Sequence, residues 1–519
     1  MRRLSRDCGA ESTQVSQSNP IGVAGRTTQG AAWLVGARLV VRGLDFILLL
    51  ALGRLLGPAD FGIVAIAMTL ITVMEAVTEL PLVQGLISLP EITRPHLDTA
   101  FTLGLLRGLM LALLLGLLAW PFAWSYHDLR LVPIICALSL APATRGLASP
   151  AMALYARQIS FHRDFILEIS GKLASFAVAL SLALATRSYW ALVAGSLMTP
   201  LAGALISYTI APYRPRLSLS RWRPFWSFIG WNTAAQLVAA VNWQCDRFLI
   251  SRHLDRATLG RFTMASDLSA LPVQALVVPL LRPLTAAFAL FRDDRERLAT
   301  AYLGTTTALL ALATPVMVGL SALAGPAVQL VLGDEWVDTA TTLRWLALAM
   351  LTGCLVTPLG ALAMARGRTN VFLAQGSVEF AIKIPAVIAG VLLFGIKGVI
   401  IARMAAAVLA ALSAMLFARR LCGLSLGRQF VTAWRIVAGG AVSYVALDLL
   451  LPWMPLGLGE IALALRLLIA ALAGGGVYAV TVLTLWKFSG SPDGVEATVY
   501  ATVVRLLSPG VRRFGSVAI

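Results

Sequence analysis

Residues 30–62 read GAAWLVGARLVVRGLDFILLLALGRLLGPADFG and begin with an apolar segment, 33–52, that is long enough to span a membrane. Arg38, Arg42 and Asp45 lie inside this segment at positions i, i+4 and i+7, so they share one face of the predicted helix. Each charge near the centre of a spanning helix costs roughly 2.5–3.5 kcal/mol. The charged face is therefore predicted to contact protein or water rather than lipid.

The composition of the chain is that of a polytopic membrane protein. Of its 519 residues, 58% are hydrophobic and only 13% are charged, whereas soluble domains carry about 25% charged residues. The formal net charge of +17 would suit a nucleic-acid partner. The basic residues, however, lie in short segments between apolar stretches, which is typical of cytoplasmic loops. We therefore predict no binding of nucleic acid.

Residues that could support catalysis or hold a metal are sparse and scattered. The four histidines lie in loops without cysteine or carboxylate partners at ligand spacing. No glycine-rich nucleotide-binding loop occurs, and no loop is long enough for a soluble catalytic domain. We expect no metal, no cofactor and no enzymatic activity. The cysteines have no paired spacing and are interpreted as packing residues: Cys8, Cys136, Cys245, Cys354 and Cys422.

Apolar segments of membrane-spanning length recur along the chain. Because a span needs about 20 apolar residues, we expect about fourteen transmembrane helices. The fold class is predicted to be an all-α polytopic membrane protein, with two six-helix lobes and two additional C-terminal helices. The expected organisation is a disordered cytoplasmic tail (1–26), an N-lobe (27–211), a basic cytoplasmic linker (212–225), a C-lobe (226–420), two further spans (421–486) and a cytoplasmic tail (487–519).

Lysine and arginine are concentrated in alternate loops, which predicts that both termini are cytoplasmic. One loop assigned to the opposite side is an exception, because it contains Arg252, Arg256 and Arg261.

Two pairs of segments indicate an internal repeat. LGRLLGPADFG (52–62) aligns without gaps with ISRHLDRATLG (250–260), and LEISGKL (167–173) aligns with VEFAIKI (378–384). The members of each pair occupy equivalent places in the two predicted lobes. Two halves with the same order and an even number of crossings form a parallel repeat about an axis along the membrane normal.

The second pair of segments places a carboxylate and an ammonium group one helical turn apart in each lobe, Glu168 with Lys172 and Glu379 with Lys383. Two interpretations are open. The opposite charges can neutralise each other and hold the helix in its bundle. Alternatively, the lysines present cations to an anionic substrate and the glutamates tune them.

Other charged residues lie within or at the ends of predicted spans. Arg38 has an alternative interpretation, since it would extend to the cytoplasmic face if the helix began near Ala37. Glu75 and Glu79 form a like-charge pair at i, i+4, whose cost predicts a protonated member or nearby arginines. The candidate substrate-binding cations are Arg38, Arg42, Arg107, Arg145, Lys172, Arg282, Lys383 and Arg403. The candidate coupling or structural acids are Asp45, Glu75, Glu79, Glu168, Asp246, Asp267 and Glu379.

Four stretches resemble a known family. They are LGRLLGPADFGIVAIAMTL (52–70), LVQGLISLPEITRPHLDTAF (82–101), RQISFHRDFILEISGK (157–172) and LGDEWVDTATTLRWLALAM (332–350). Together they resemble the polysaccharide-transport flippases of the colanic-acid and exopolysaccharide exporter branch, within the multidrug/oligosaccharidyl-lipid/polysaccharide exporter superfamily. The chain departs from the family at 78–81, where Thr-Glu-Leu-Pro stands in place of the small residues and glycine of many relatives.

The resemblance implies a transporter of the bacterial inner membrane. Its expected substrate is an isoprenoid-pyrophosphate-linked oligosaccharide repeat unit for exopolysaccharide, capsule or O-antigen synthesis. Its expected mechanism is alternating access of two lobes around a basic cavity, with a polysaccharide polymerase and export machinery as partners. Two alternatives are an ion-coupled drug or cation antiporter of the same superfamily, whose cavity should be acidic and aromatic, and a membrane polymerase or ligase of lipid-linked sugars, which needs a sizeable external loop.

Overall fold

The computed structural model describes residues 36, 40–157, 161–223, 229–368, 370–453, 459–490 and 497, which form helices and no β-strand. Within these residues, nine helices are long and apolar enough to cross a membrane: Pro58–Ile87, Arg94–Ser125, His162–Thr186, Trp190–Ile210, Arg295–Ala322, Thr339–Ala365, Leu373–Cys422, Leu426–Trp453 and Glu460–Phe488. The predicted all-α, multi-pass membrane fold is confirmed. The predicted number of about fourteen spans is not confirmed.

The N-terminal group of helices covers residues 40–210. Residues 40–55 are helical, and Pro58 then starts the next helix at a position where its missing N–H costs nothing. Non-helical residues 79–81 separate this helix from the following one, because Pro81 cannot continue it. The helices are α3 (Pro58–Val77), α4 (Leu82–Ser88), α5 (Arg94–Ser125), α6 (Leu131–Leu138), α7 (Leu140–Gly146), α8 (Met152–Arg157), α9 (Phe161–Thr186) and α10 (Trp190–Ile210).

The C-terminal group covers residues 229–488. Its longest helix consists of two helices joined at Gly395, whose φ of 58° is left-handed and suits glycine. The helices are α12 (Ile229–His253), α13 (Arg256–Leu276), η2 (Val278–Leu280), α14 (Leu281–Leu290), α15 (Arg295–Ala322), α16 (Ala324–Leu332), η3 (Asp334–Trp336), α17 (Thr339–Met350), α18 (Gly353–Ala365), α19 (Asn370–Cys422), α20 (Leu426–Leu450), η4 (Leu451–Trp453) and α21 (Glu460–Phe488).

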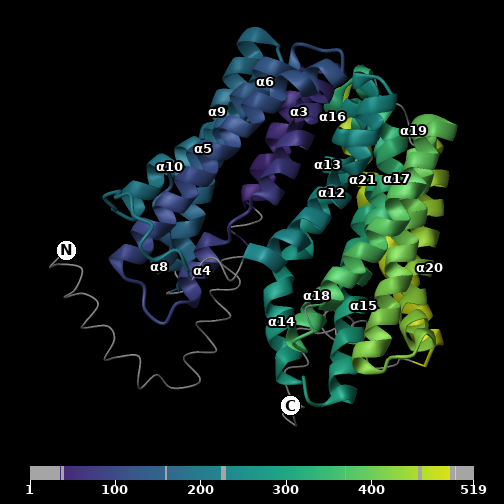
Figure 1. Ribbon diagram of the computed structural model, residues 1–519. Helices are drawn as coiled ribbons and strands as arrows, with labels where there is room; N and C mark the ends of the chain where they lie inside the picture. The colour runs from purple at the N-terminus through teal and green to yellow at the C-terminus, as the bar shows by residue number, and fades with distance from the viewer. Residues whose placement is uncertain are drawn as a thin grey trace, which may run out of the picture.

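The two groups meet at one end of the molecule and diverge toward the other (Figure 1). At the meeting end α3 packs against both α12 and α13. Between the groups, residues 211–222 are non-helical, and Tyr213 donates a hydrogen bond of 2.6 Å to Asp98 of α5. Burial, together with this carboxylate, raises the pKa of the Tyr213 phenol, so the hydroxyl keeps the proton that it donates. The connecting segment is thereby held on the N-terminal group.

The contact between α3 and α13 has the reciprocity of a two-fold axis. The alignment of 52–62 with 250–260 makes Gly62 equivalent to Gly260, and Pro58 equivalent to Arg256. A Cβ atom on Gly62 would overlap the carbonyl of Arg256, and a Cβ atom on Gly260 would overlap the carbonyl of Pro58. Each glycine thus packs against the backbone of the other copy, which is the pattern of an isologous interface.

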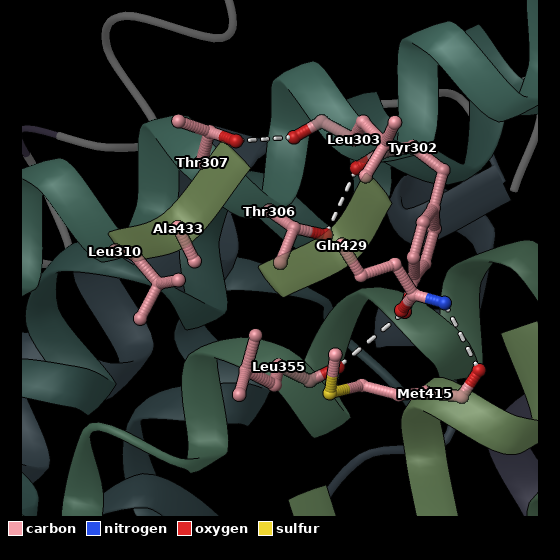
Figure 2. A pocket seen from close by; sticks show the side chains of 9 residues that line it. All are labelled: Tyr302, Leu303, Thr306, Thr307, Leu310, Leu355, Met415, Gln429 and Ala433. Carbon is pink, nitrogen blue, oxygen red and sulfur yellow. Dashed lines mark hydrogen bonds between the residues drawn. The ribbon is translucent and has the colours of Figure 1, made fainter. Parts of the chain in front are cut away.

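The last two spans belong to the C-terminal group. Within it, α20 packs against α15, and α21 packs against α15 and α16. Figure 2 shows a small cavity in this contact, lined by Tyr302 of α15, Leu355 of α18 and Gln429 of α20, among others. The Gln429 side chain donates a 3.1 Å hydrogen bond to the carbonyl of Met415 in α19. The cavity holds about 10 Å³, enough for one water molecule, so it is a packing feature and no substrate site.

Candidate functional site

The first charged cluster joins the helix at residues 40–55 to α9. The ammonium of Lys172 lies 2.5 Å from one oxygen of Asp45, and the guanidinium of Arg42 lies 3.3 Å from the other oxygen. The side chains of Arg42, Lys172 and Asp45 are 41%, 28% and 20% exposed. Two cations therefore share one carboxylate, and the cluster keeps a positive charge that remains partly open to the surroundings.

The second charged cluster occupies the corresponding place in the C-terminal group. Asp246 of α12 pairs at 3.1 Å with Lys383, in the part of α19 before Gly395, and also with Arg403, in the part after Gly395. Lys383 additionally donates to the carbonyl of Asn242. The side chains of Asp246, Lys383 and Arg403 are only 1%, 6% and 13% exposed. This cluster is therefore enclosed among helices, in contrast to its counterpart.

The two clusters revise the interpretation of the lysines. Among the described residues, Lys172 forms its ion pair with Asp45 and Lys383 forms its ion pair with Asp246, and neither lysine pairs with the glutamate one turn before it. Glu168 lies on an exposed part of α9 and Glu379 is half-buried. The ion pairs of these lysines thus run between helices rather than within one helix. A lysine that has lost water on packing needs a carboxylate in direct contact to offset that cost, and the neighbouring helix supplies it.

Arginines lie near the like-charge pair Glu75 and Glu79. Nearby arginines were one of the two arrangements that the sequence predicted for this pair. Arg145 of α7 lies 2.7 Å from the carboxylate of Glu75. Arg107 of α5 donates a 3.1 Å hydrogen bond to the backbone carbonyl of Glu75, in the last turn of α3. Both glutamates add negative potential at Arg107. Nearby cations thus offset the two carboxylates at the break between α3 and α4.

The remaining predicted residues fall into two sets. Asp267 of α13 pairs at 2.6 Å with Arg247 of α12, a residue that the sequence analysis did not single out. Its position directly after Asp246, inside a predicted span, is the signal that could have identified it. Arg38 lies outside the described residues, as does the side chain of Arg282, whose backbone belongs to α14.

The charged residues offer no metal site in the part of the chain that the structure describes, where no three histidine, cysteine, aspartate or glutamate side chains gather at ligand distance. Of the candidate cations with described side chains, Arg42, Lys172 and Arg145 are the more exposed, and Lys383 and Arg403 are enclosed. The exposed cations all belong to the N-terminal group.

A comparison with known protein families shows to which family the chain belongs. Residues 51–341 match the model of the family described as polysaccharide biosynthesis protein. The chain belongs to this family. The family predicted from the sequence motifs is confirmed.

Two curated relatives carry names consistent with the family. The chain is 24% identical over 386 residues to the lipopolysaccharide biosynthesis protein WzxC of Escherichia coli (strain K12), covering 72% of this chain and 77% of that protein. It is 26% identical over 337 residues to the succinoglycan biosynthesis transport protein ExoT of Rhizobium meliloti (strain 1021), covering 63% and 67%.

Two solved structures share the fold. The inward closed conformation of the lipid II flippase MurJ has a TM-score of 0.71 and 13% identity, covering 88% of this chain and 99% of that one. An inward-facing multidrug resistance MATE transporter of the MOP superfamily has a TM-score of 0.59 and 15% identity, covering 75% and 99%. At these identities the likeness establishes the transporter fold alone.

Proposed function

We propose that the protein is a flippase that moves an isoprenoid-pyrophosphate-linked oligosaccharide repeat unit across the bacterial inner membrane, for exopolysaccharide, capsule or O-antigen synthesis. The observation that carries this proposal is the partly exposed cluster of Arg42, Asp45 and Lys172, which keeps a net positive charge within a spanning segment. The family and the names of WzxC and ExoT support the class of substrate.

The chemistry of the cluster suits a diphosphate. Arg42 can donate two parallel hydrogen bonds to phosphate oxygens, and Lys172 supplies a compact point charge. Asp45 holds both cations in place while the site is empty of substrate. It also compensates part of their positive charge, which would be costly without a counter-ion in the bilayer. A diphosphate then competes with one carboxylate for two cations, so binding and release both remain feasible.

The orientation follows from the distribution of basic residues. Both termini and the 212–225 linker are proposed to be cytoplasmic, since these segments are rich in arginine. The end at which the two groups meet is then the outer end, and the end at which they diverge faces the cytoplasm (Figure 1). The N-lobe (27–211) and C-lobe (226–420) would alternate access by moving against each other. Polymerase and export machinery would consume the product outside.

The first test is deletion of the gene, followed by mass spectrometry of isoprenoid-linked glycans. Accumulation of a complete, unpolymerised repeat unit that remains on the cytoplasmic side is expected, and its structure would identify the sugar. Polymerised product at normal level in the deletion strain would contradict the proposal.

The second test restores the gene with an altered cluster. Arg42→Ala should reduce export at least tenfold with normal insertion, because one of the two cations that bind the anion is lost. Lys397→Ala is the matched control, since Lys397 is exposed and takes part in none of the described ion pairs. Export by Arg42→Ala equal to that by the control, at equal expression, would remove the cluster from the substrate path.

The alternative of a drug or cation antiporter shares the fold, as the MATE likeness indicates. The exposed charges of the site disfavour it, because a positively charged cluster repels a cationic drug. A polymerase or ligase is disfavoured by the short loops of the described residues.

A further inference from the structure

The loop with Arg252, Arg256 and Arg261 is basic although it is predicted to lie outside, and two of these arginines contact the other group at the meeting end. Arg252, at the end of α12, donates a 3.1 Å hydrogen bond to the carbonyl of Ser125, at the end of α5. Arg256, at the start of α13, lies 2.6 Å from the carboxylate of Asp128. Both arginines belong to the C-terminal group, and both partners belong to the N-terminal group.

Asp128 is the centre of this contact. It lies between α5 and α6, and its side chain is only 7% exposed. Besides Arg256 it binds Arg130 of its own group, through the backbone N–H at 3.1 Å and the Nε at 3.1 Å. A carboxylate that is buried between two moving bodies and neutralised from both sides holds them together, because separation leaves it without one partner.

Aromatic packing closes the same end. Trp336, in the Gly-Asp-Glu-Trp segment of the C-terminal group, is 1% exposed and donates a 2.8 Å hydrogen bond to the carbonyl of Gly53. Its ring meets the ring of Phe61 edge to face, with centroids 5.3 Å apart. The stretches 52–70 and 332–350, which carry two of the family motifs, thus contact each other directly. On the same side Tyr126 and Ser251 share a 2.9 Å hydrogen bond between the groups.

We propose that Asp128, Arg256, Trp336 and the reciprocal glycines Gly62 and Gly260 form the outer gate, and that Arg252 and Arg256 are kept on the outer side because they hold this gate closed. The proposal rests on the orientation given under Proposed function. It accounts for two of the three arginines of this loop, since Arg252 and Arg256 bind residues of the N-terminal group, whereas Arg261 pairs with Asp338 of its own group. Opening requires the pair of Asp128 with Arg256 to separate and Trp336 to leave Gly53.

The test measures access to a buried position of the gate. Leu259 of α13 is fully buried, so Leu259→Cys, in a variant without the native cysteines, reports opening through its rate of labelling by a membrane-impermeant maleimide from outside. Asp128→Asn and Arg256→Gln should each raise this rate several-fold. Arg187→Gln is the control, because Arg187 is exposed and forms no ion pair among the described residues. Equal rates in the control and in both gate variants would overturn the proposal.

The backbone packing of the glycines provides a second, independent test of the gate. Gly260→Ala should raise the labelling rate because its methyl group would overlap the Pro58 carbonyl, whereas Gly116→Ala in α5 has no atom within 4 Å and should not. Labelling only from the cytoplasmic side would overturn the assignment as an outer gate. The assay needs no substrate, so it can succeed while the polysaccharide proposal fails, and the glycan analysis of the deletion strain tests that proposal separately.

Discussion

Lys172 and Lys383 occupy equivalent positions of the repeat, yet their side chains are 28% and 6% exposed. The difference separates two roles that the sequence left as alternatives. Lys172 shares its carboxylate with Arg42 in a partly open cluster, which suits ligand binding. Lys383 shares its carboxylate with Arg403 among packed helices, which suits a fixed contact between α12 and α19.

We therefore expect opposite effects from the same substitution at the two sites. Lys172→Met should reduce export strongly while the thermal unfolding of the purified protein changes little. Lys383→Met should leave export per folded molecule near normal but lower the unfolding temperature, since removing one partner of a buried ion pair costs about 3–5 kcal/mol, less here because Arg403 remains. Export and thermal unfolding, measured on both variants, check this. Identical profiles for the two variants would contradict the distinction.

The sequence located the charged residues of the site, and the i, i+3 spacing of Arg42 and Asp45 predicts the pair that they form, but it did not give their partners on other helices. Asp45, Lys172, Asp246 and Lys383 were all identified, because a charge inside an apolar span is conspicuous. Their pairing depends on which helices pack together, and residue spacing within one helix carries no information about that. The i, i+4 rule therefore suggested Glu168 as the partner of Lys172, where tertiary packing supplies Asp45.

At the scale of the elements, the start of α13 is fixed by its N-cap. The side chain of Asp255 accepts hydrogen bonds from the backbone N–H of Thr258 at 3.0 Å and from its hydroxyl at 2.5 Å. Partial burial raises the pKa of Asp255, but the hydrogen bonds from Thr258 and the nearby Arg261 outweigh it, and the pKa is lowered overall. This cap sets the direction in which α13 leaves the outer gate.

The cap should stabilise α13 in a pH-dependent manner. Because the folded-state pKa of Asp255 is lowered, its contribution is present above the unfolded value of about 3.9 and is lost as the pH falls through the folded value. Asp255→Ala should cost about 1 kcal/mol at neutral pH, and the difference from the unmodified protein should shrink in acid. Thermal unfolding at several pH values measures this. A difference that grows toward acid pH would show that the cap acts in another way.

Helix boundaries followed from the sequence where local chemistry sets them. The Gly57-Pro58 turn and the break at residues 79–81 both lie at prolines, whose fixed φ and missing N–H act locally. The number of crossings was harder to obtain. The segment Leu373–Cys422 contains two helices joined at Gly395, while Leu131–Gly146 forms two short helices, α6 and α7.

At the scale of the whole molecule, the sequence correctly predicted a repeat and a transporter fold. The repeat was visible because 52–62 and 250–260 align without gaps. The unequal burial of the two charged clusters was not visible, since burial depends on neighbours from several helices. The inequality places the more exposed candidate cations on the N-terminal group, whereas α20 and α21 pack against helices of the C-terminal group.

The reciprocal packing of Gly62 and Gly260 has a thermodynamic consequence. Both contacts report on one motion, the separation of α3 from α13, so the two positions are energetically coupled. Once Gly62→Ala has pushed the helices apart, Gly260→Ala meets no carbonyl and adds little. In a double-mutant cycle the combined loss of stability should fall short of the sum of the single losses by about 0.5–3 kcal/mol. Strict additivity would mean that the helices yield locally at each glycine, whereas a shortfall would establish that the two halves of the chain separate as one cooperative unit.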